Sequence, residues 1–333
     1  PQSTRSLPAA AGNLPPSSLE APAPVRRALF ITNRLEPGGA ERMLLSLVTR
    51  LRSFGVEPFI GCLQDAGPLA GECHSRAISV FENLLHFKTD AAVLVRLRRI
   101  LRDHRIDIIV AAHSGGDRMF WSTLAGRLAR VPVVVWSHWF PVPPTRHFER
   151  ANRLLFRWVD AYVALGERHR QALIRREYVP AGRIIVIPNA IDLAHFVSSP
   201  SRVDARRCLG LADGQVAVAI IANLRREKRH DVFIHAARRL ASENPRLRFF
   251  IIGDGPHRQA VHAAAAASGL SPDVLRLLGP RNDVAALLPG IDISGLCSDL
   301  ECFSVTMLEA AAAGCAFIGP DSGGLPDFLE HRR

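Results

Sequence analysis

Residues 28–50 have the sequence ALFITNRLEPGGAERMLLSLVTR and are predicted to contain the first strand and the first helix of the fold. The apolar run at 28–33 predicts a buried strand, and the helical pattern at 40–54 follows it. Between them, Gly38 and Gly39 let the backbone approach a ligand closely, and the free amides at a helix start favour an anion. An ordinary strand–helix turn has the same composition, and no third glycine completes a GxGxxG dinucleotide motif.

The same alternation continues outward along the chain to about residue 190. Further strands are predicted at residues 58–63, 106–111, 133–137 and 161–165. Helical patterns separate them at residues 91–104, 118–129 and 167–178. Such alternation predicts a parallel sheet with helices on both faces.

A second series follows residues 191–202, with strands predicted at 216–222, 247–252, 274–278, 291–295 and 316–319 and helices at about 231–242, 256–267, 284–288, 305–313 and 325–330. The predicted fold class is therefore α/β, with two Rossmann-like domains at residues 25–190 and 191–333. They are expected to face each other across a cleft, because ligands bind beyond the carboxyl ends of such strands. Residues 1–24 are rich in Pro, Ala and Ser without periodicity and are expected to form a disordered tail.

Composition excludes several classes of protein. With 48% hydrophobic and 22% charged residues among 333, the chain can bury large cores and is neither a disordered nor a fibrous protein. No apolar run approaches the ~18 residues that a transmembrane helix needs. The six cysteines form no CxxC pair and no cluster with histidine. This pattern argues against a zinc site and a disulfide framework, and it favours a reducing cytoplasm.

The net charge of +11 lies entirely in the first part of the chain, since residues 1–190 carry 26 basic and 15 acidic side chains. No RNP-like aromatic motif or recognition helix accompanies this charge, so nucleic acid is not a predicted partner. The helix predicted at 91–104 combines apolar residues with nearby arginines, namely Arg96, Arg98, Arg99, Arg102 and Arg105. An amphipathic surface helix accounts for this pattern, and docking on an anionic membrane surface is the alternative.

Only two of the 42 basic residues are lysines, and one of them, Lys228, lies in the turn NLRREKR at residues 223–229. This turn follows a predicted strand and precedes a helix, so its cations would provide a positive field where a diphosphate could bind. A solvated basic turn is the commoner role of such a run. The rarity of lysine in this chain favours anion binding.

Two further turns repeat the order of strand, glycine and helix start. The turn GDGP at residues 253–256 begins with Gly253 and places proline at a favoured first-turn position. The turn GPRNDV occupies residues 279–284, and Asp283 has an alternative role there as a helix cap. Each turn alone is a weak indication of a ligand site.

The most specific local pattern is SDLECFSVTMLEA at residues 298–310. Glu301 lies in the turn before a predicted helix and Glu309 about one turn inside it, so both can point to the edge where the strands end. A carboxylate there can accept two hydrogen bonds from adjacent hydroxyls of a ribose or a hexose. The alternative is that Glu301 interacts with the helix dipole and that Glu309 is a surface residue.

In their order and spacing, these segments resemble the GT4 family of retaining glycosyltransferases, also called glycosyl transferases group 1. The resemblance covers about residues 28–330 through the motifs GGAER, IPNAID, NLRREK, IIGDGP, GPRNDV, Glu301-x7-Glu309 and Gly323-Gly324. It implies the GT-B fold, with a nucleotide-sugar donor held mainly by the second domain and an acceptor held mainly by the first.

The resemblance implies four catalytic residues. Lys228 and Arg225 would hold the diphosphate, and Glu301 would contact the donor sugar. His138 matches the active-site histidine of the family, and His113 is a weaker candidate. The donor-binding positions, with Glu309 on the ribose hydroxyls and residues 281–284 beside the base, are Gly38, Gly39, Gly253, Arg281, Asn282, Asp283, Val284, Cys302, Phe303, Ser304, Val305 and Glu309.

Three positions depart from the family pattern: Asn223 where arginine is common, Cys302 where glycine is usual and Asp327 where glutamate is usual. Arg225 would then supply the guanidinium that position 223 lacks. Relatives continue with further elements where this chain ends, so the second domain is expected to be truncated.

The predicted function is transfer of a hexose-type sugar from a nucleoside-diphosphate sugar to a hydroxyl of a glycan or lipid-linked acceptor, with retention at the anomeric carbon, as in polysaccharide biosynthesis. No carboxylate cluster for a divalent metal accompanies the motifs, so transfer is expected to be independent of metal, with no cofactor. The expected location is the cytoplasm, with peripheral contact at the inner membrane face. The alternatives are a donor-binding protein with poor turnover and a Rossmann-fold NAD-dependent epimerase or dehydrogenase.

Overall fold

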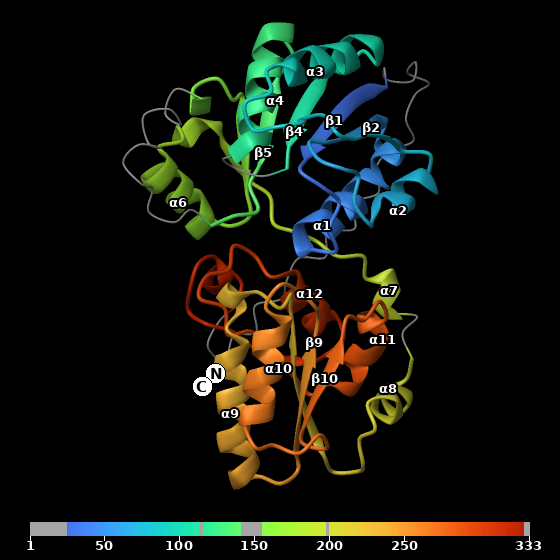
Figure 1. Ribbon diagram of the computed structural model, residues 1–333, viewed down its shortest axis with the longest axis vertical. Coiled ribbons are helices and arrows are strands. Elements are labelled where there is room, and N and C mark those ends of the chain that lie inside the picture. The colour runs from blue at the N-terminus through green and yellow to red at the C-terminus, as the bar shows by residue number, and fades with distance from the viewer. Residues whose placement is uncertain (1–24, 113–115, 141–154, 198–199, 330–333) are drawn as a thin grey trace, which may run out of the picture.

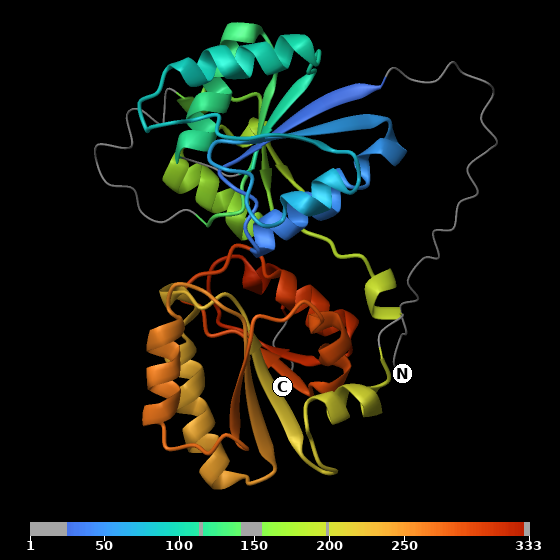
Figure 2. The ribbon, with the colours of Figure 1, turned by 45° about the vertical axis from the view of Figure 1, so that its right-hand side comes forward.

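The computed structural model describes residues 25–112, 116–140, 155–197 and 200–329. They form two α/β domains in sequence, each built on one parallel sheet, and the domains lie one above the other in Figures 1 and 2. The fold class predicted from the sequence is confirmed. The predicted tail at residues 1–24 and the candidate His113 lie outside the described residues.

The first sheet has seven parallel strands in the order β3-β2-β1-β4-β5-β6-β7. They are β1 (Arg26–Thr32), β2 (Val56–Cys62), β3 (Ser79–Phe81), β4 (Ile108–Ala111), β5 (Val133–Trp136), β6 (Ala161–Ala164) and β7 (Ile184–Val186). All five strands predicted for this domain are present. β3 and β7 are missing from the prediction, because three residues are too few to show a periodic pattern.

Helices cover both faces of this sheet (Figure 2). They are α1 (Gly39–Val48), α2 (Ala70–His74), α3 (Ala92–Asp103), α4 (Gly116–Ala129) and α6 (Glu167–Glu177), with 3-10 turns at Leu51–Phe54 and Ala181–Arg183. The helix predicted at 40–54 is shorter than expected. Its last residues form the separate 3-10 turn, which ends at Gly55 with a φ of 72° that glycine adopts easily.

The arginine-rich helix α3 lies on the surface of the first domain. Val93, Leu97 and Leu101 are buried against the sheet, as an amphipathic helix requires. One of its arginines, Arg96, forms an ion pair with Asp90 at 2.7 Å. Within the described ranges, no helix has both the length and the apolar composition to cross a bilayer.

The second sheet has five parallel strands in the order β10-β9-β8-β11-β12. They are β8 (Val216–Ile221), β9 (Leu247–Ile252), β10 (Leu275–Gly279), β11 (Ile293–Gly295) and β12 (Ala316–Ile318), all at predicted positions. Its helices are α7 (Ala194–Val197), α8 (Arg202–Cys208), α9 (His230–Glu243), α10 (Arg258–Ala267), α11 (Val284–Leu287) and α12 (Val305–Ala312), with 3-10 turns at Arg226–Lys228, Leu288–Gly290 and Leu325–Asp327. The helix predicted at 325–330 is wrong for the described residues, because only the short 3-10 turn forms there.

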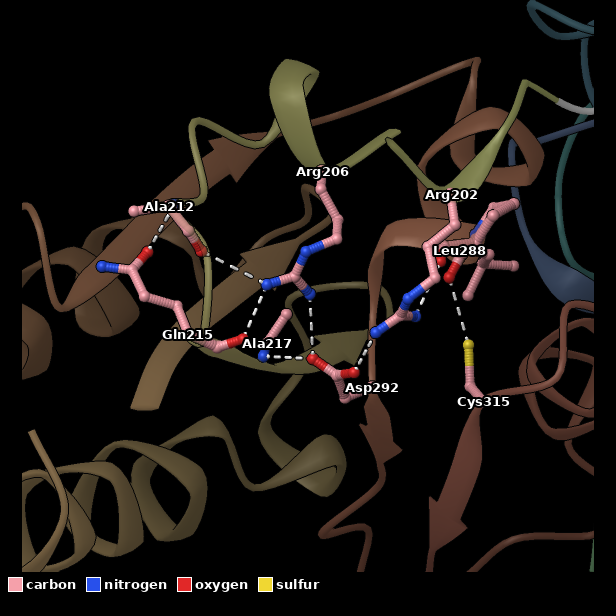
Figure 3. A network of polar contacts seen from close by, with 9 residues as sticks. Arg202, Arg206, Ala212, Gln215, Ala217, Leu288, Asp292 and Cys315 are labelled. Atoms are coloured by element: carbon pink, nitrogen blue, oxygen red, sulfur yellow. Dashed lines mark hydrogen bonds and ion pairs between the residues drawn. The ribbon is translucent and has the colours of Figure 1, made fainter. Parts of the chain in front are cut away.

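Asp292 joins α8 to the amino ends of β8 and β11 (Figure 3). Its carboxylate accepts a hydrogen bond from the Ala217 N–H at 2.8 Å and forms ion pairs with Arg206, at 3.2 Å, and with Arg202. Arg206 also donates to the carbonyl of Gln215 at 2.6 Å. This network stabilises the amino-terminal end of the sheet. Ligands of α/β sheets bind at the opposite end, beyond the carboxyl ends of the strands.

The two domains share one apolar cluster. Met43 of α1 packs in it together with Phe303 and Met307 of the second domain, and less than a tenth of each residue is exposed. At the edge of this contact, the backbone N–H of Arg168 donates to Oδ2 of Asp327 at 2.8 Å. Because Arg168 lies in the first turn of α6, Asp327 caps that helix from the other domain.

Glu177, at the end of α6, has a partly buried carboxylate within the first domain, and the pH dependence of stability tests that burial. Its Oε2 is buried without a hydrogen-bond partner in the described part of the chain, and burial raises the pKa of its carboxyl from 4.5 to about 7. Because the folded state binds the proton of this carboxyl more tightly than the unfolded state does, the pKa shift contributes to the free energy of unfolding. This contribution is fully present below the unfolded pKa and is lost as the pH rises through about 7.

We therefore expect Glu177→Gln, which resembles the neutral carboxyl, to increase the free energy of unfolding at pH 8 by up to about 3 kcal/mol and to change it little at pH 4.5. Urea denaturation at both pH values measures the difference. Glu167→Gln, at the exposed start of the same helix, is the control and should give no gain at pH 8. The same gain for Glu177→Gln at both pH values would contradict the burial of an ionisable carboxyl.

Candidate functional site

The starts of α1 and α12 meet at the boundary between the domains, where α1 lies directly above α12 in Figure 1. A Cβ built on Gly39 would lie 4.0 Å from Cγ2 of Val305, the first residue of α12. α1 follows β1 and α12 follows β11, so both helix starts belong to loops at the carboxyl ends of strands. The positive ends of two helix dipoles therefore come close together, which favours an anion between the domains.

Lys228 and Glu301 lie on either side of the switch point of the second sheet. The chain adds β9 and β10 on one side of β8 and then places β11 on its other side. Lys228 belongs to the turn after β8, and Glu301 belongs to the loop after β11. Such a change of direction is where α/β sheets bind ligands.

The two side chains form an ion pair between Lys228 Nζ and Glu301 Oε1. The hydroxyl of Ser298 donates to the same carboxylate oxygen at 2.6 Å. Only 7% of Glu301 is exposed, so its carboxylate is held by an ammonium and a hydroxyl in a largely desolvated place. The structure thus brings together the residues expected to hold the diphosphate and the sugar.

The other cations of the turn have different environments. Arg229 forms ion pairs with Asp231 at 3.0 Å and with Asp299 at 2.9 Å, so its charge is neutralised locally. Arg225 is exposed, and its charge acts on Glu41 of the first domain. The cations of this turn therefore do not act as one field: Lys228 and Arg229 are each paired with carboxylates of the second domain, and the charge of Arg225 acts on Glu41 of the first domain.

Glu41 lies against the glycine turn of the first domain. A Cβ built on Gly38 would lie 2.5 Å from Glu41 Oε2, so glycine is needed there for the carboxylate to keep its position. Burial raises the pKa of Glu41, while the charges of Arg118 and Arg225 oppose this shift. The charges of Arg118 in the first domain and of Arg225 in the second therefore both act on Glu41.

Arg118 is a site residue that the sequence analysis does not identify. It lies in the first turn of α4, and burial lowers the pKa of its guanidinium, against the opposing charge of Glu41. A cation in the first turn of a helix is unfavourable to the helix dipole. An arginine in the first turn of a helix that follows a strand is therefore unusual, and this sequence signal could have identified Arg118 as a candidate.

Glu309 lies one turn inside α12 and faces α1. Burial raises the pKa of its carboxyl, and the charge of Arg42 in α1 opposes the shift. Within the described residues, no hydrogen bond or ion pair of the Glu309 carboxylate is present. Glu309 is partly buried rather than fully exposed, and a carboxylate with no hydrogen bond among the described residues can accept from hydroxyl groups of a ligand.

Gly253 lies at the end of β9 with a φ of 145°, and a Cβ there would lie 2.0 Å from the carbonyl oxygen of Ala222. Only glycine lets this turn pack so closely against the end of β8. Its N–H donates to the carbonyl of Gly279 at 2.9 Å, so the turns after β9 and β10 are joined.

Residues 281–284 follow the edge strand β10 and are separated from β8 by β9. Arg281 and Asp283 form an ion pair at 2.5 Å, Asn282 is exposed, and Val284 packs on the core. Asp283 occupies the cap position of α11, but its side chain makes no capping bond, because the carboxylate is directed to Arg281. The helix-cap alternative for this side chain is therefore wrong, and no contact joins these residues to Lys228 within the described chain.

The residues after Glu301 have structural contacts. Ser304 caps α12 by accepting from the Met307 N–H at 3.1 Å, and the ring of Phe303 packs edge to face on Phe328 with 4.4 Å between centroids. A Cβ on Gly323 would lie 1.9 Å from the carbonyl oxygen of Glu301. The Gly323-Gly324 turn thus packs directly against the backbone of the Glu301 loop, and a larger residue would not fit there.

His138 follows β5, with its ring 4.2 Å from that of Trp136 between centroids. Its neighbour Ser137 contacts Nε2 of His169 at 3.2 Å, and Nδ1 of His169 contacts Sγ of Cys302 at 3.1 Å. His138 and Glu301 are therefore next to the two ends of one chain of contacts. His169 is absent from the sequence predictions, because nothing in its local pattern indicates a partner 133 residues away.

Comparison with known families covers both domains. Residues 37–195 match the family "Glycosyltransferase Family 4", and residues 202–333 match "Glycosyl transferases group 1".

Curated relatives have transferase names. The UDP-Gal:alpha-D-GlcNAc-diphosphoundecaprenol alpha-1,3-galactosyltransferase of Escherichia coli is 28% identical over 71% of this chain and 63% of its own length. The 2-deoxystreptamine N-acetyl-D-glucosaminyltransferase of Streptomyces fradiae is 27% identical over 71% of this chain and 60% of its own. The chain thus spans less than two thirds of either relative.

Solved structures show the same fold. Anabaena HepE, in a crystal structure with UDP and glucose, has a TM-score of 0.78 at 23% identity, over 92% of this chain and 83% of that one. WaaG, described as a glycosyltransferase involved in lipopolysaccharide biosynthesis, has a TM-score of 0.70 at 16% identity, over 89% and 82% of the two chains. Together with the two family matches, which run from residue 37 to residue 333, this fold shows that the chain belongs to the GT4-type glycosyltransferases of the GT-B fold.

Proposed function

We propose that this chain transfers a hexose-type sugar from a nucleoside-diphosphate donor to a hydroxyl acceptor with retention at the anomeric carbon. The observation that carries the proposal is the arrangement at the switch point, where Lys228 and Glu301 are paired and Glu309, one turn inside α12, has no hydrogen bond or ion pair to the residues that the structure describes. The names of relatives that transfer galactose or N-acetylglucosamine support it, as do the UDP and UDP-glucose complexes of HepE.

The positive groups at this point suit the leaving group. As the bond between the anomeric carbon and the diphosphate oxygen breaks, the electron pair leaves with that oxygen, and the ammonium of Lys228 stabilises the added charge. The backbone amides and dipole at the start of α12 act in the same direction. Glu301 holds Lys228 in place before the donor binds, so little reorganisation is needed, and Arg225 adds a second charge.

The carboxylates suit the hydroxyl groups of the donor. Glu301 accepts hydrogen bonds from the sugar and Glu309 from the ribose, while His138 lies on the side of the transferred sugar. The acceptor oxygen forms its bond to the anomeric carbon on the face from which the diphosphate departs, and its proton passes to the departing phosphate oxygen. Attack on that face gives retention in a single transfer.

The first domain is proposed to bind a glycan or lipid-linked acceptor. The relatives carry names with different acceptors, a diphosphoundecaprenol-linked sugar for one and 2-deoxystreptamine for another, so acceptor identity is not a family property. A cytoplasmic location with peripheral contact to an anionic membrane surface fits the exposed arginines of α3, Arg98, Arg99 and Arg102. A donor-binding protein with poor turnover is the alternative, and it predicts donor binding without transfer.

Lys228→Arg and Lys228→Ala test the assignment of the leaving-group cation. Lys228→Ala should reduce transfer on the order of 10²-fold, as for loss of one donor to a developing anion. Lys228→Arg should also be impaired although it keeps the charge and the partner for Glu301, because a planar guanidinium differs in shape and hydration from an ammonium. Donor turnover, measured beside thermal unfolding, checks both.

Arg226→Ala is the matched control, since it removes an exposed charge from the same turn. It should transfer at nearly the normal rate. Normal transfer by either Lys228 variant would contradict the role given to this lysine.

Glu309→Gln and Glu301→Gln separate the two carboxylates. Loss of a charged hydrogen-bond partner costs about 1.5–3 kcal/mol, so Glu309→Gln should weaken nucleoside diphosphate binding roughly 10- to 100-fold. Glu301→Gln should leave diphosphate affinity undiminished, because it also releases Lys228, while it weakens binding or transfer of the intact donor. Titration calorimetry with the diphosphate and with the full donor measures both effects.

Glu227→Gln, in the turn of Lys228, is the control for charge alone and should bind both ligands normally. Equal loss of diphosphate affinity in the Glu309 and Glu301 variants would contradict the division of roles. Heat of binding with NAD in the same experiment would support the dehydrogenase or epimerase alternative instead.

Transfer is proposed to need no metal ion. No group of three or more His, Cys, Asp or Glu side chains is placed to hold a metal in the part of the chain that the structure describes. Lys228 and Arg225 would supply the positive charge in place of a cation. EDTA should therefore leave the transfer rate unchanged, whereas loss of activity with EDTA and recovery with Mg²⁺ or Mn²⁺ would show that this proposal is wrong.

A further inference from the structure

The contact between His169 and Cys302 joins the two domains. His169 lies in α6 of the first domain and is completely buried, and 8% of Cys302 in the second domain is exposed. Nδ1 of the imidazole lies 3.1 Å from Sγ of Cys302. Cys302 is the position where the family resemblance leads to glycine being expected, so this contact depends on a side chain that glycine lacks.

The neighbours of His169 determine which atoms donate. The backbone N–H of Leu165 can only donate, and it lies 3.1 Å from Nδ1, which must therefore be an acceptor. The proton of the neutral ring is then on Nε2, which donates to Oγ of Ser137 at 3.2 Å. The Ser137 hydroxyl in turn donates to the carbonyl of Trp139 at 3.3 Å.

The Cys302 thiol is then a second donor to Nδ1 and shares the single lone pair of that nitrogen with the Leu165 N–H. Burial raises the pKa of its thiol well above the usual value, so it keeps its proton and can donate. Every polar hydrogen in this chain of contacts thus has an acceptor, which a thiolate or a protonated imidazole would not allow.

The two ends of this chain of contacts lie next to proposed catalytic residues. Ser137 precedes His138, and Cys302 follows Glu301. On its other side, the Glu301 carbonyl accepts from the Gly324 N–H at 2.8 Å, so the loop is held by the second domain there. Among the side chains of residues 301–303, that of Cys302 reaches the first domain through its contact with Nδ1 of His169.

We propose that His169 and Cys302 are positioning residues that form a clasp between the domains and set Glu301 relative to His138. The clasp rests on the proposed function, because it acts through those two residues. A displacement of a reacting group by about 1 Å can cost on the order of 10²-fold in rate, so a clasp at this place influences kcat more than donor affinity. Simple packing in the apolar cluster is the competing explanation, and it predicts effects on stability alone.

Kinetics of Cys302→Ala, His169→Phe and the double variant test the clasp. Each single variant should lower kcat at least fivefold at saturating donor, with the KM for donor and the unfolding midpoint little changed. The double variant should be no worse than the more impaired single variant, because both remove the same contact. Cys302→Ser keeps a donor to Nδ1 and should recover most of the rate.

Cys315→Ala is the matched control, since Cys315 is also 8% exposed and its thiol donates at 3.2 Å to Leu288 within the second domain. It should transfer at the normal rate. Normal kcat in Cys302→Ala or His169→Phe, additive losses in the double variant, or an equal loss in Cys315→Ala would each overturn the clasp.

Hydrogen exchange gives a readout that needs no substrate. His169→Phe and Cys302→Ala should both increase exchange in residues 137–140 and 299–304, and Cys315→Ala should increase neither. Unchanged exchange in both clasp variants would overturn the clasp. If exchange increases in both clasp variants but the unmodified chain transfers no sugar, the clasp is supported and only the proposed function is contradicted.

Discussion

The carboxyl ends of parallel strands all lie at one edge of a sheet, and the candidate site depends on this constraint in both domains. The loops after β8 and β11 are far apart in sequence and are neighbours because their strands are parallel and adjacent. The glycine turn after β1, at the same end of the first sheet, meets the start of α12 where the two domains pack together. The opposite edge of the second sheet is closed by the Asp292 network and presents no loop of the site. The Asp292 network and the candidate site therefore lie at opposite ends of the same strands.

Glycine makes the close approaches at that edge possible. Gly253 packs against the end of β8, and Gly323 packs beneath the carbonyl of Glu301, where added Cβ atoms would lie 2.0 and 1.9 Å from backbone oxygens. Both residues have a positive φ, which glycine adopts easily. Glycine is therefore required at each position for two reasons, the backbone conformation and the lack of space for a side chain. The ion pair of Lys228 with Glu301 then joins loops whose backbones are already fixed, which gives a preorganised pair of charges.

Much of the fold follows from local sequence pattern. All ten predicted strands are present, and the family and the GT-B fold inferred from the motifs are confirmed. The missing elements, β3 and β7 among them, are too short to show periodicity, and the helix predicted after Gly324 has only one 3-10 turn in the described residues. The roles of the site residues stay predictions. The influence of Arg118 on Glu41 and the contact of His169 with Cys302 could not be predicted, because the approach of side chains that are far apart in sequence leaves no pattern in local spacing.

A crystal structure of this chain with an intact nucleotide-sugar donor would test the proposed site most sharply. We expect the donor at the boundary between the domains, with its diphosphate about 3 Å from Lys228 Nζ and its ribose hydroxyls on the carboxylate of Glu309. The sugar should lie between Glu301 and His138. A donor bound at the amino ends of the strands, or held by the first domain without contact to Lys228 and Glu309, would contradict the proposed site.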